Sequence, residues 1–170
     1  KKNYGAHKNQ GGGVILDAIH EINYARWLFG DVDKVFCISG KISNLKINTE
    51  DYASINMVMK NKSLVNINLD YLQHNYNRHC LVVGEKGSLK WDFNDHELKI
   101  FLKKNKKWKS IVKIKNIDFN ETYLNELKNF LIATNNSNNK LEVKSDEGKK
   151  DLIIALAAHK SSKVKKFIKV

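Results

Sequence analysis

The spacing of hydrophobic and polar residues changes along the chain from helical to extended and back again. Residues 14–29 carry apolar side chains around most of a helix, directly after three consecutive glycines. Between residues 32 and 114, apolar and polar positions alternate with a period of two, which is typical of strands with one buried face. Helical spacing returns over residues 120–131. A polar loop at 135–139 and a last helix, with Ser145 as its predicted N-cap, follow.

Turn residues divide the extended part into short strands. Ile55, Met57 and Met59 share one face of the second strand, and the third strand has Asn66 and Asn68 opposite its apolar positions. Short connections favour neighbouring antiparallel strands, so the predicted fold class is α+β: an open, mainly antiparallel β-sheet with helices packed on one face. The other face is predicted to be solvated or used for self-association. The strands are predicted at residues 32–47, 53–60, 64–72, 79–84, 88–93, 97–102 and 108–114.

The last helix and the two cysteines provide further predicted core positions. His159 in this helix is predicted to be structural. Cys37 and Cys80 are far apart in sequence and each lies in an apolar run, so both are predicted to be buried, reduced thiols. The helix residues predicted to pack inward are Leu152, Ile153, Leu156 and Ala157.

Composition agrees with one globular domain that contains a sizeable core. The chain has 170 residues, of which 42% are hydrophobic. No apolar run is long enough to cross a bilayer, and the first residues lack the apolar core of a signal peptide. A cytoplasmic location without a membrane partner is therefore expected. No cluster of residues has metal-ligand spacing, so no metal site is expected.

The formal charge of +12 raises the hypothesis of a nucleic-acid-binding protein. Of the 30 basic residues, however, only Arg26 and Arg78 are arginines, the residue type that reads phosphates and bases with two parallel hydrogen bonds. The lysines are spread out, and their denser runs fall at 103–107, between two predicted strands, and at 163–166, near a helix end. Solvated lysines are the favoured interpretation, and no nucleic-acid partner is expected.

The glycine-led helix carries the candidate chemistry. Asp17, His20 and Tyr24 follow one another at i, i+3 and i+7, so they share a helix face. An ionisable pair on an apolar helix points to an active site. The alternatives are that Asp17 complements the helix dipole and that His20 is a hydrogen-bonded core histidine. Gly12 and Gly13 either let the backbone approach a ligand closely or form a plain tight turn.

The run from Gly11 to Gly30 resembles the segment that opens the C-terminal half of the glucose-fructose oxidoreductase, inositol dehydrogenase and MocA (Gfo/Idh/MocA) family of NAD(P)-dependent oxidoreductases. Members show a glycine triplet, an apolar run, an aspartate, a histidine, and a Trp-Leu pair before a glycine. His20 follows Asp17 by three residues where many members have four, and Asn23 stands where an aspartate is frequent. Further similar segments lie at residues 50–53, 83–91, 123–127 and 157–162.

The resemblance implies that residues 1–170 form a single C-terminal α/β domain for substrate binding and oligomerisation. In the family, a dinucleotide-binding Rossmann domain precedes this segment, and this chain has no Gly-x-Gly-x-x-Gly turn after a strand. NAD or NADP would therefore be bound mainly by that missing domain, with no cofactor-binding residues here. This fragment alone is expected to be inactive. A homo-oligomer formed through the open sheet face is also implied.

The function implied by the resemblance is hydride transfer between a nicotinamide and a secondary alcohol of a sugar, sugar derivative or cyclitol. His20 would exchange the proton of the reacting hydroxyl, a role that suits histidine because its pKa lies near neutral pH. Asp17 would bind the substrate or orient the imidazole. The alternatives are a non-catalytic assembly domain of the same fold and, less favoured, a basic nucleic-acid-binding domain. The residues expected at the substrate pocket are Asp17, Tyr24, Tyr4, His7, Gly12 and Gly13, with surface positions in a frayed terminus as the alternative for Tyr4 and His7.

Overall fold

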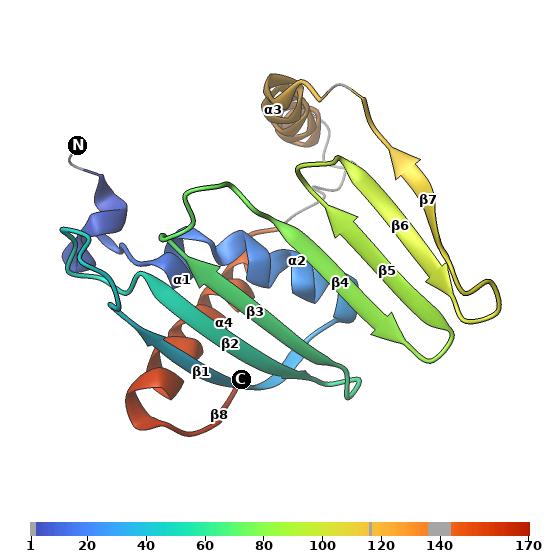
Figure 1. Ribbon diagram of the computed structural model, residues 1–170. Helices are drawn as coiled ribbons and strands as arrows, with labels where there is room; N and C mark the ends of the chain where they lie inside the picture. Colours follow the sequence, from blue (N-terminus) through green and yellow to red (C-terminus); the bar gives the residue numbers. More distant parts are fainter. Residues whose placement is uncertain (1–2, 116, 136–143) are drawn as a thin grey trace. The chain divides into compact units, whose positions relative to one another are not determined.

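The computed structural model describes residues 3–115, 117–135 and 144–170 (Figure 1). The chain divides into two compact units, one formed by Lys1–Leu72 with Glu142–Val170 and the other by Gln73–Leu141. The elements of the first unit are η1 (Tyr4–Ala6), η2 (Lys8–Gln10), α1 (Val14–Asp17), α2 (Ile19–Phe29), β1 (Val32–Gly40), β2 (Tyr52–Met59), β3 (Leu64–Asp70), α4 (Ser145–Val164) and β8 (Ile168–Lys169). Those of the second are β4 (His79–Gly84), β5 (Gly87–Asp92), β6 (Glu97–Leu102), β7 (Trp108–Lys113) and α3 (Phe119–Asn135).

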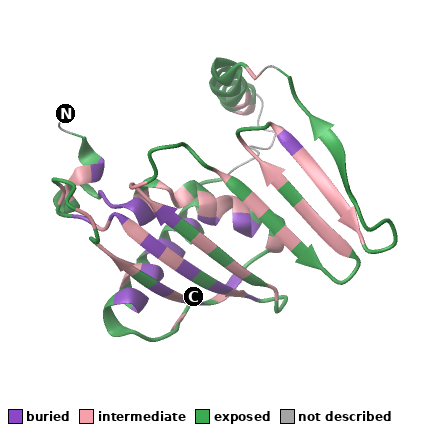
Figure 2. Cartoon of the chain, in the orientation of Figure 1, coloured by how far each residue is buried: buried purple, intermediate pink, exposed green. Residues whose placement is uncertain are grey.

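The first unit contains an antiparallel sheet of four strands in the order β3-β2-β1-β8. Its period-two pattern is the one predicted: Cys37 lies opposite Ile55, which lies opposite Ile67, and Cys37 and Ile55 are fully buried. Met57 and Met59 lie on the same buried face, as predicted. Buried residues alternate with less buried ones along β2 in Figure 2. The register is therefore set by the apolar side chains that face the core.

Helices α1, α2 and α4 cover one face of this sheet (Figure 1). The core between the two layers is a single cluster of apolar side chains. Together with the antiparallel sheet of the second unit, this arrangement confirms the α+β class with open antiparallel sheets. The buried apolar residues of the cluster are Val14, Ile15, Ile22, Ala25, Val32, Val35, Cys37, Ala53, Ile55, Met57, Met59, Leu69, Ile154, Ala155, Ala157 and Ala158.

Small residues, rather than the larger apolar ones, form the inner face of α4. Ala157 is buried as predicted, but Leu152, Ile153 and Leu156 are 43–53% exposed, so their predicted inward packing is wrong. The buried positions instead follow Asp151 at helical spacing and lie close to β1, and most of them carry short side chains, with Ile154 as the exception. They are Asp151, Ile154, Ala155, Ala157, Ala158, Ser161 and Ser162. The helix begins at Ser145, with Lys144 and not Ser145 at the N-cap.

The first predicted helix is interrupted. It divides into α1 and α2 at Ala18, whose φ of −100° and ψ of 29° lie outside the helical range. Trp27 and Leu28, at the end of α2, are 81% and 44% exposed, so not all the apolar side chains of residues 14–29 are buried. The break separates Asp17, at the end of α1, from His20, in the first turn of α2.

Strand β1 ends at Gly40 and not near residue 47 as predicted, because a buried carboxylate binds the next backbone donors. Asp51 is fully buried. Its carboxylate accepts hydrogen bonds from the backbone N–H of Ile42 at 2.7 Å and of Ser43 at 3.1 Å, and from the Ser43 hydroxyl. Burial alone would raise the pKa of the Asp51 carboxyl, but these hydrogen bonds outweigh it and hold the pKa below its usual value.

Replacing Asp51 with asparagine is expected to lower the free energy of unfolding at pH 7 by about 1–3 kcal/mol, because an amide nitrogen would face one of these donors. The folded-state pKa of Asp51 is lower than the unfolded-state value, so its stabilisation is present above the unfolded-state pKa and is lost as the pH falls through the folded-state pKa. Urea unfolding at several pH values should therefore show that the difference in the free energy of unfolding between wild type and Asp51→Asn becomes smaller in acid. Asp146→Asn, at an exposed position, is the control. If the free energy of unfolding depends on pH in the same way in both variants, the stabilising role of the Asp51 carboxylate is contradicted.

The second unit is an antiparallel sheet of four strands in sequence order, β4-β5-β6-β7, followed by α3. The bounds of β4 and β6 are those predicted. The strands of the chain thus form two sheets and not one continuous meander. The Phe93 ring stacks on Phe119 at 5.6 Å, and the Arg78 guanidinium lies over the rings of Trp91 and Phe93 at 5.4 and 5.7 Å. All but the first residue of the predicted loop at 135–139 lies outside the described residues.

Candidate functional site

The glycine turn before α1 is closely packed on both sides. A Cβ at Gly12 would lie 2.5 Å from the carbonyl oxygens of Tyr4 and Gly5, and a Cβ at Gly13 would overlap the Glu50 carboxylate. Gly13 also has a φ of +117°, in the region that favours glycine. Contacts within the chain therefore account for the glycines at these two positions. Close approach of a ligand to the turn stays a prediction.

Two tyrosines hold the carboxylate of Asp17. The Tyr4 hydroxyl donates a hydrogen bond to Asp17 Oδ1 at 2.5 Å, and the Tyr71 hydroxyl donates one to Oδ2 at 3.1 Å. Tyr4 lies in η1, whereas Tyr71 directly follows β3, where its backbone N–H donates to the carbonyl oxygen of Asp51 at 2.9 Å. Asp17 itself is exposed. The carboxylate is therefore fixed in position and still accessible to a ligand.

Both phenols are donors at neutral pH. The hydrogen bond to Asp17 and the negative charge of that carboxylate raise the pKa of Tyr4. Burial raises the pKa of Tyr71 most, and the charges of Asp17 and Glu50 raise it further. Neither tyrosine can therefore act as a base at neutral pH. Tyr4 was predicted from the sequence, but Tyr71 was not, because no local pattern links it to Asp17, 54 residues away.

Glu50 fixes the start of α1 beside this carboxylate. Its carbonyl oxygen accepts a hydrogen bond from Val14 N–H at 3.1 Å, and its Oε1 accepts one from Ile15 N–H at 3.2 Å. The Nε2 atom of His159 lies 3.7 Å from the same Oε1. Glu50 lies within a segment that resembles the family pattern, yet the sequence did not predict its contact with Ile15. The His159 side chain of α4 therefore lies near the beginning of α1.

The remaining predicted residues are placed differently. The His20 side chain is 61% exposed, and its Nε2 lies 3.3 Å from Glu21 Oε1. In the part of the chain that the structure describes, no hydrogen bond or ion pair joins His20 to Asp17. His7 shapes the turn through its carbonyl oxygen, which accepts from Gln10 and Gly12 N–H, both at 3.0 Å. The structure thus joins Asp17, Tyr4, Gly12 and Gly13 in one cluster, while His20 and the half-buried Tyr24 lie on α2.

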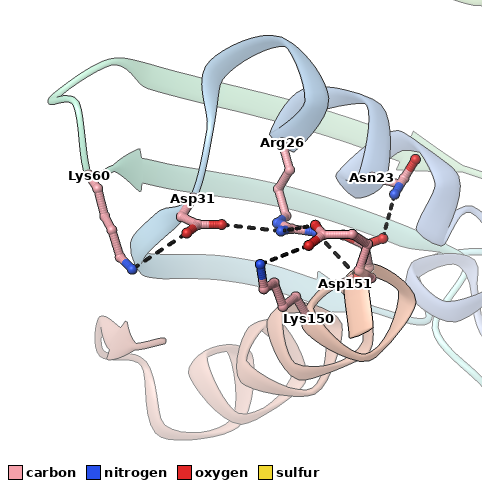
Figure 3. A network of polar contacts seen from close by, with 7 residues as sticks. Asn23, Arg26, Asp31, Lys60, Lys150 and Asp151 are labelled. Carbon is pink, nitrogen blue, oxygen red and sulfur yellow. Dashed lines mark hydrogen bonds and ion pairs between the residues drawn. The ribbon is translucent and has the colours of Figure 1, made fainter. Parts of the chain in front are cut away.

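A second polar cluster joins α2 to α4 (Figure 3). The Arg26 guanidinium, 7% exposed, donates to Asp151 Oδ1 at 2.6 Å and to Glu147 Oε2 at 2.8 Å, and reaches Asp31 at 3.2 Å. Asn23 donates to the other Asp151 oxygen at 2.6 Å. Burial opposes the charge of Arg26, but these hydrogen bonds outweigh it and raise its pKa. Asn23, which departs from the family pattern, therefore belongs to this helix-joining cluster.

The described residues contain neither a metal-binding cluster nor a membrane-spanning helix. Within residues 3–115, 117–135 and 144–170, no group of three or more His, Cys, Asp or Glu side chains could hold a metal ion. None of the helices in these same ranges combines the length and hydrophobicity needed to cross a bilayer. Cys37 and Cys80 are free thiols, the first buried and the second half-buried, and burial raises the pKa of Cys37 to about 11. Cys37 is therefore not a reactive thiolate at neutral pH.

Comparisons with known proteins agree with one another. The profile of the GFO/IDH/MocA C-terminal domain matches residues 1–90. Among solved structures, a levoglucosan dehydrogenase in complex with NADH and levoglucosan has a TM-score of 0.84 at 18% identity, over 99% of this chain and 53% of that one. An NAD binding oxidoreductase from Klebsiella pneumoniae has a TM-score of 0.85 at 13% identity, over 99% and 54%.

An oxidoreductase from Agrobacterium radiobacter, in complex with NAD+, L-tartaric acid and magnesium, has a TM-score of 0.79 at 17% identity, over 99% of this chain and 52% of that one. The comparison with curated proteins gave no match. The chain thus spans about half the length of the solved structures that it matches. At these identities, the likeness to them concerns the fold.

Proposed function

The chain belongs to the Gfo/Idh/MocA family through the C-terminal domain of these oxidoreductases, and from this premise we propose that it is the substrate-binding half of an NAD(P)-dependent oxidoreductase. Its substrate is a sugar, a sugar derivative or a cyclitol. The observation that carries the proposal is the exposed Asp17 carboxylate, which Tyr4 and Tyr71 hold from two separate segments. Hydroxyl groups of such a substrate are suitable donors to this carboxylate.

The proposed roles follow from the position of each group. Asp17 binds substrate hydroxyls, and His20, exposed on the following helix, takes the proton of the reacting hydroxyl. A nicotinamide bound to another domain would supply the hydride acceptor. We propose that NAD or NADP binds mainly to a domain outside this chain, as membership of the family implies. The chain alone is expected to be inactive.

The assembly part of the proposal rests on the face of the β3-β2-β1-β8 sheet opposite helices α1, α2 and α4. Ile38 and Leu64 are 52% and 79% exposed on this face. Beside them, Asn66 donates to Asn56 at 3.1 Å, and Asn68 donates to Asn66 at 2.6 Å. We propose that a second copy of the chain packs on this face. The second candidate function, a non-catalytic assembly domain, would use this face and would not require Asp17.

The proposed location is the cytoplasm. Both cysteines are free, and Cys37 lies in the core, where a disulfide could not reach it without rearrangement. Free thiols are typical of a reducing compartment. No nucleic-acid partner is proposed, because the arginines that could read phosphates are engaged: Arg26 in the buried cluster and Arg78 over aromatic rings.

The proposal is tested by assaying the full-length protein with NAD+ or NADP+ and a panel of levoglucosan, myo-inositol and D-glucose. Formation of NADH or NADPH with at least one of these polyols is expected. Asp17→Asn should lower kcat/KM by about 10–100-fold, because a charge-assisted hydrogen bond to the substrate is lost. Asp95→Asn, an exposed position, is the matched control. No turnover with either cofactor would contradict the proposal and favour the assembly domain.

A further inference from the structure

The Asp17 carboxylate has unused capacity to accept hydrogen bonds. A carboxylate offers about four lone-pair positions on its two oxygens. The phenols of Tyr4 and Tyr71 each use one, on different oxygens. Asp17 is nevertheless exposed, so each oxygen can accept a further donor from a ligand. The two positions that remain are on the two oxygens of one carboxylate, so two donors that bind them must lie close to each other.

The surroundings of this carboxylate are negative. Both Asp17 and Glu50 lie close enough to Tyr71 for their charges to raise the pKa of its phenol. Within the described residues, no ion pair joins Asp17 to a lysine, arginine or histidine. Such a site attracts neutral donors such as hydroxyl groups and repels carboxylates and phosphates.

Tyr71 is the member of the cluster with the best-defined position. Its ring is half-buried against the core, and its backbone N–H is bound to the Asp51 carbonyl oxygen. The loop that ends in Asp51 is in turn tied to the buried Asp51 carboxylate. Tyr4, by contrast, is 55% exposed in a short 3-10 helix. Tyr4 makes the shorter hydrogen bond to Asp17, whereas Tyr71 connects the carboxylate to the buried part of the sheet.

We propose that Tyr71 is a positioning residue that, together with Tyr4, holds the Asp17 carboxylate so that its two oxygens accept hydrogen bonds from two neighbouring hydroxyl groups of a neutral substrate. The inference deepens the proposed function and rests on it for the role of Asp17 in substrate binding. It adds a requirement for two adjacent hydroxyl groups and a residue that the sequence did not predict.

The first arm of the test needs no ligand. The tyrosines of the full-length protein are titrated by the ultraviolet absorbance of the phenolate, in wild type, Asp17→Asn and the control Asp95→Asn. If Tyr4 and Tyr71 bind Asp17 in solution, both phenols ionise at lower pH in Asp17→Asn, because the negative charge that raises their pKa is gone. A titration curve that Asp17→Asn leaves unchanged would overturn the inference, even in an active enzyme.

The second arm measures kcat and KM for the polyol of the panel that wild type oxidises best, and for its analogues that each lack one hydroxyl group. Tyr71→Phe is expected to raise KM for the intact polyol by about 10-fold. It should change KM much less for the analogue that lacks one of the two bound hydroxyls, since that analogue makes fewer bonds to Asp17. Tyr123→Phe removes a phenol hydroxyl from an exposed position on α3. It should change KM neither for the intact polyol nor for the analogue.

The outcomes separate the inference from the proposed function. An equal KM change for the polyol and all its analogues, or an unchanged KM in Tyr71→Phe, overturns the two-hydroxyl requirement while the oxidoreductase assignment stands. A lower KM for a sugar acid than for the matching neutral sugar overturns the charge argument. Absence of turnover with the whole panel contradicts the proposed function, whereas the phenol titration still decides whether Tyr71 and Tyr4 hold Asp17.

Discussion

Replacing Asp151 with alanine is expected to lower the free energy of unfolding by about 3–5 kcal/mol, because the buried guanidinium of Arg26 loses its closest partner. The Asp151 side chain is almost fully buried and binds Arg26 and Asn23 with its two oxygens, both at 2.6 Å. Alanine would leave the Arg26 guanidinium with only Glu147 and Asp31 as acceptors, and would remove the Asp151 oxygen that accepts from the Asn23 amide (Figure 3). Urea unfolding followed by circular dichroism measures the change.

Two further variants make this prediction specific. Asp146→Ala removes a carboxylate from an exposed position of the same helix and should change the free energy of unfolding by less than about 1 kcal/mol. The double variant Arg26→Leu with Asp151→Leu removes both buried charges and should be more stable than Asp151→Ala. A loss in Asp151→Ala no greater than in Asp146→Ala would show that water reaches Arg26 in solution.

Replacing His20 with alanine in the full-length protein is expected to lower kcat by about 10²-fold or more if His20 exchanges the proton of the reacting hydroxyl. The exposed imidazole contacts Glu21 and makes no hydrogen bond to Asp17 in the described part of the chain, so its removal should leave the fold unchanged. Steady-state kinetics with the best polyol of the panel, at several pH values, measures the effect. A thermal melt checks the fold.

His74→Ala is the matched control, since His74 is another exposed histidine and no role is proposed for it. A near-normal kcat for His20→Ala would exclude His20 as the acid-base group and move that role to another domain. A loss of kcat with restoration by added imidazole would support the assignment, because the free base can then accept the proton. The pH profile separates this role from a structural one, since only loss of the base alters the pH dependence of kcat.

Much of the local structure could be predicted from the sequence because it depends on periodic burial. The bounds of β4 and β6 agree with prediction to the residue, and the buried face of β2 was predicted from Ile55, Met57 and Met59. The predictions were wrong where a residue distant in sequence bound the backbone donors of a segment or occupied the space beside it. Strand β1 stops at Gly40 because Asp51 binds the residues that follow.

The candidate site shows the same division. The family was predicted, because the segment from Gly11 to Gly30 has a distinctive pattern. The sequence also named Asp17, Tyr4, Gly12 and Gly13 as candidates, and their role in substrate binding stays a prediction. Tyr71 was not predicted, because it meets Asp17 only when the end of β3 packs beside the start of the helix layer. The break at Ala18 could not be predicted either, since alanine favours helix and nothing local interrupts it.

The sequence by itself determined the α+β class, most of the strand positions and the family, since hydrophobic periodicity and a contiguous motif are properties of neighbouring residues. Only the tertiary structure decided which side chains surround Asp17 and which acceptors satisfy Arg26. Those contacts join residues 54 and 125 positions apart. Their formation depends on how buried helices and strands pack, because a buried charge must find partners wherever the fold brings them.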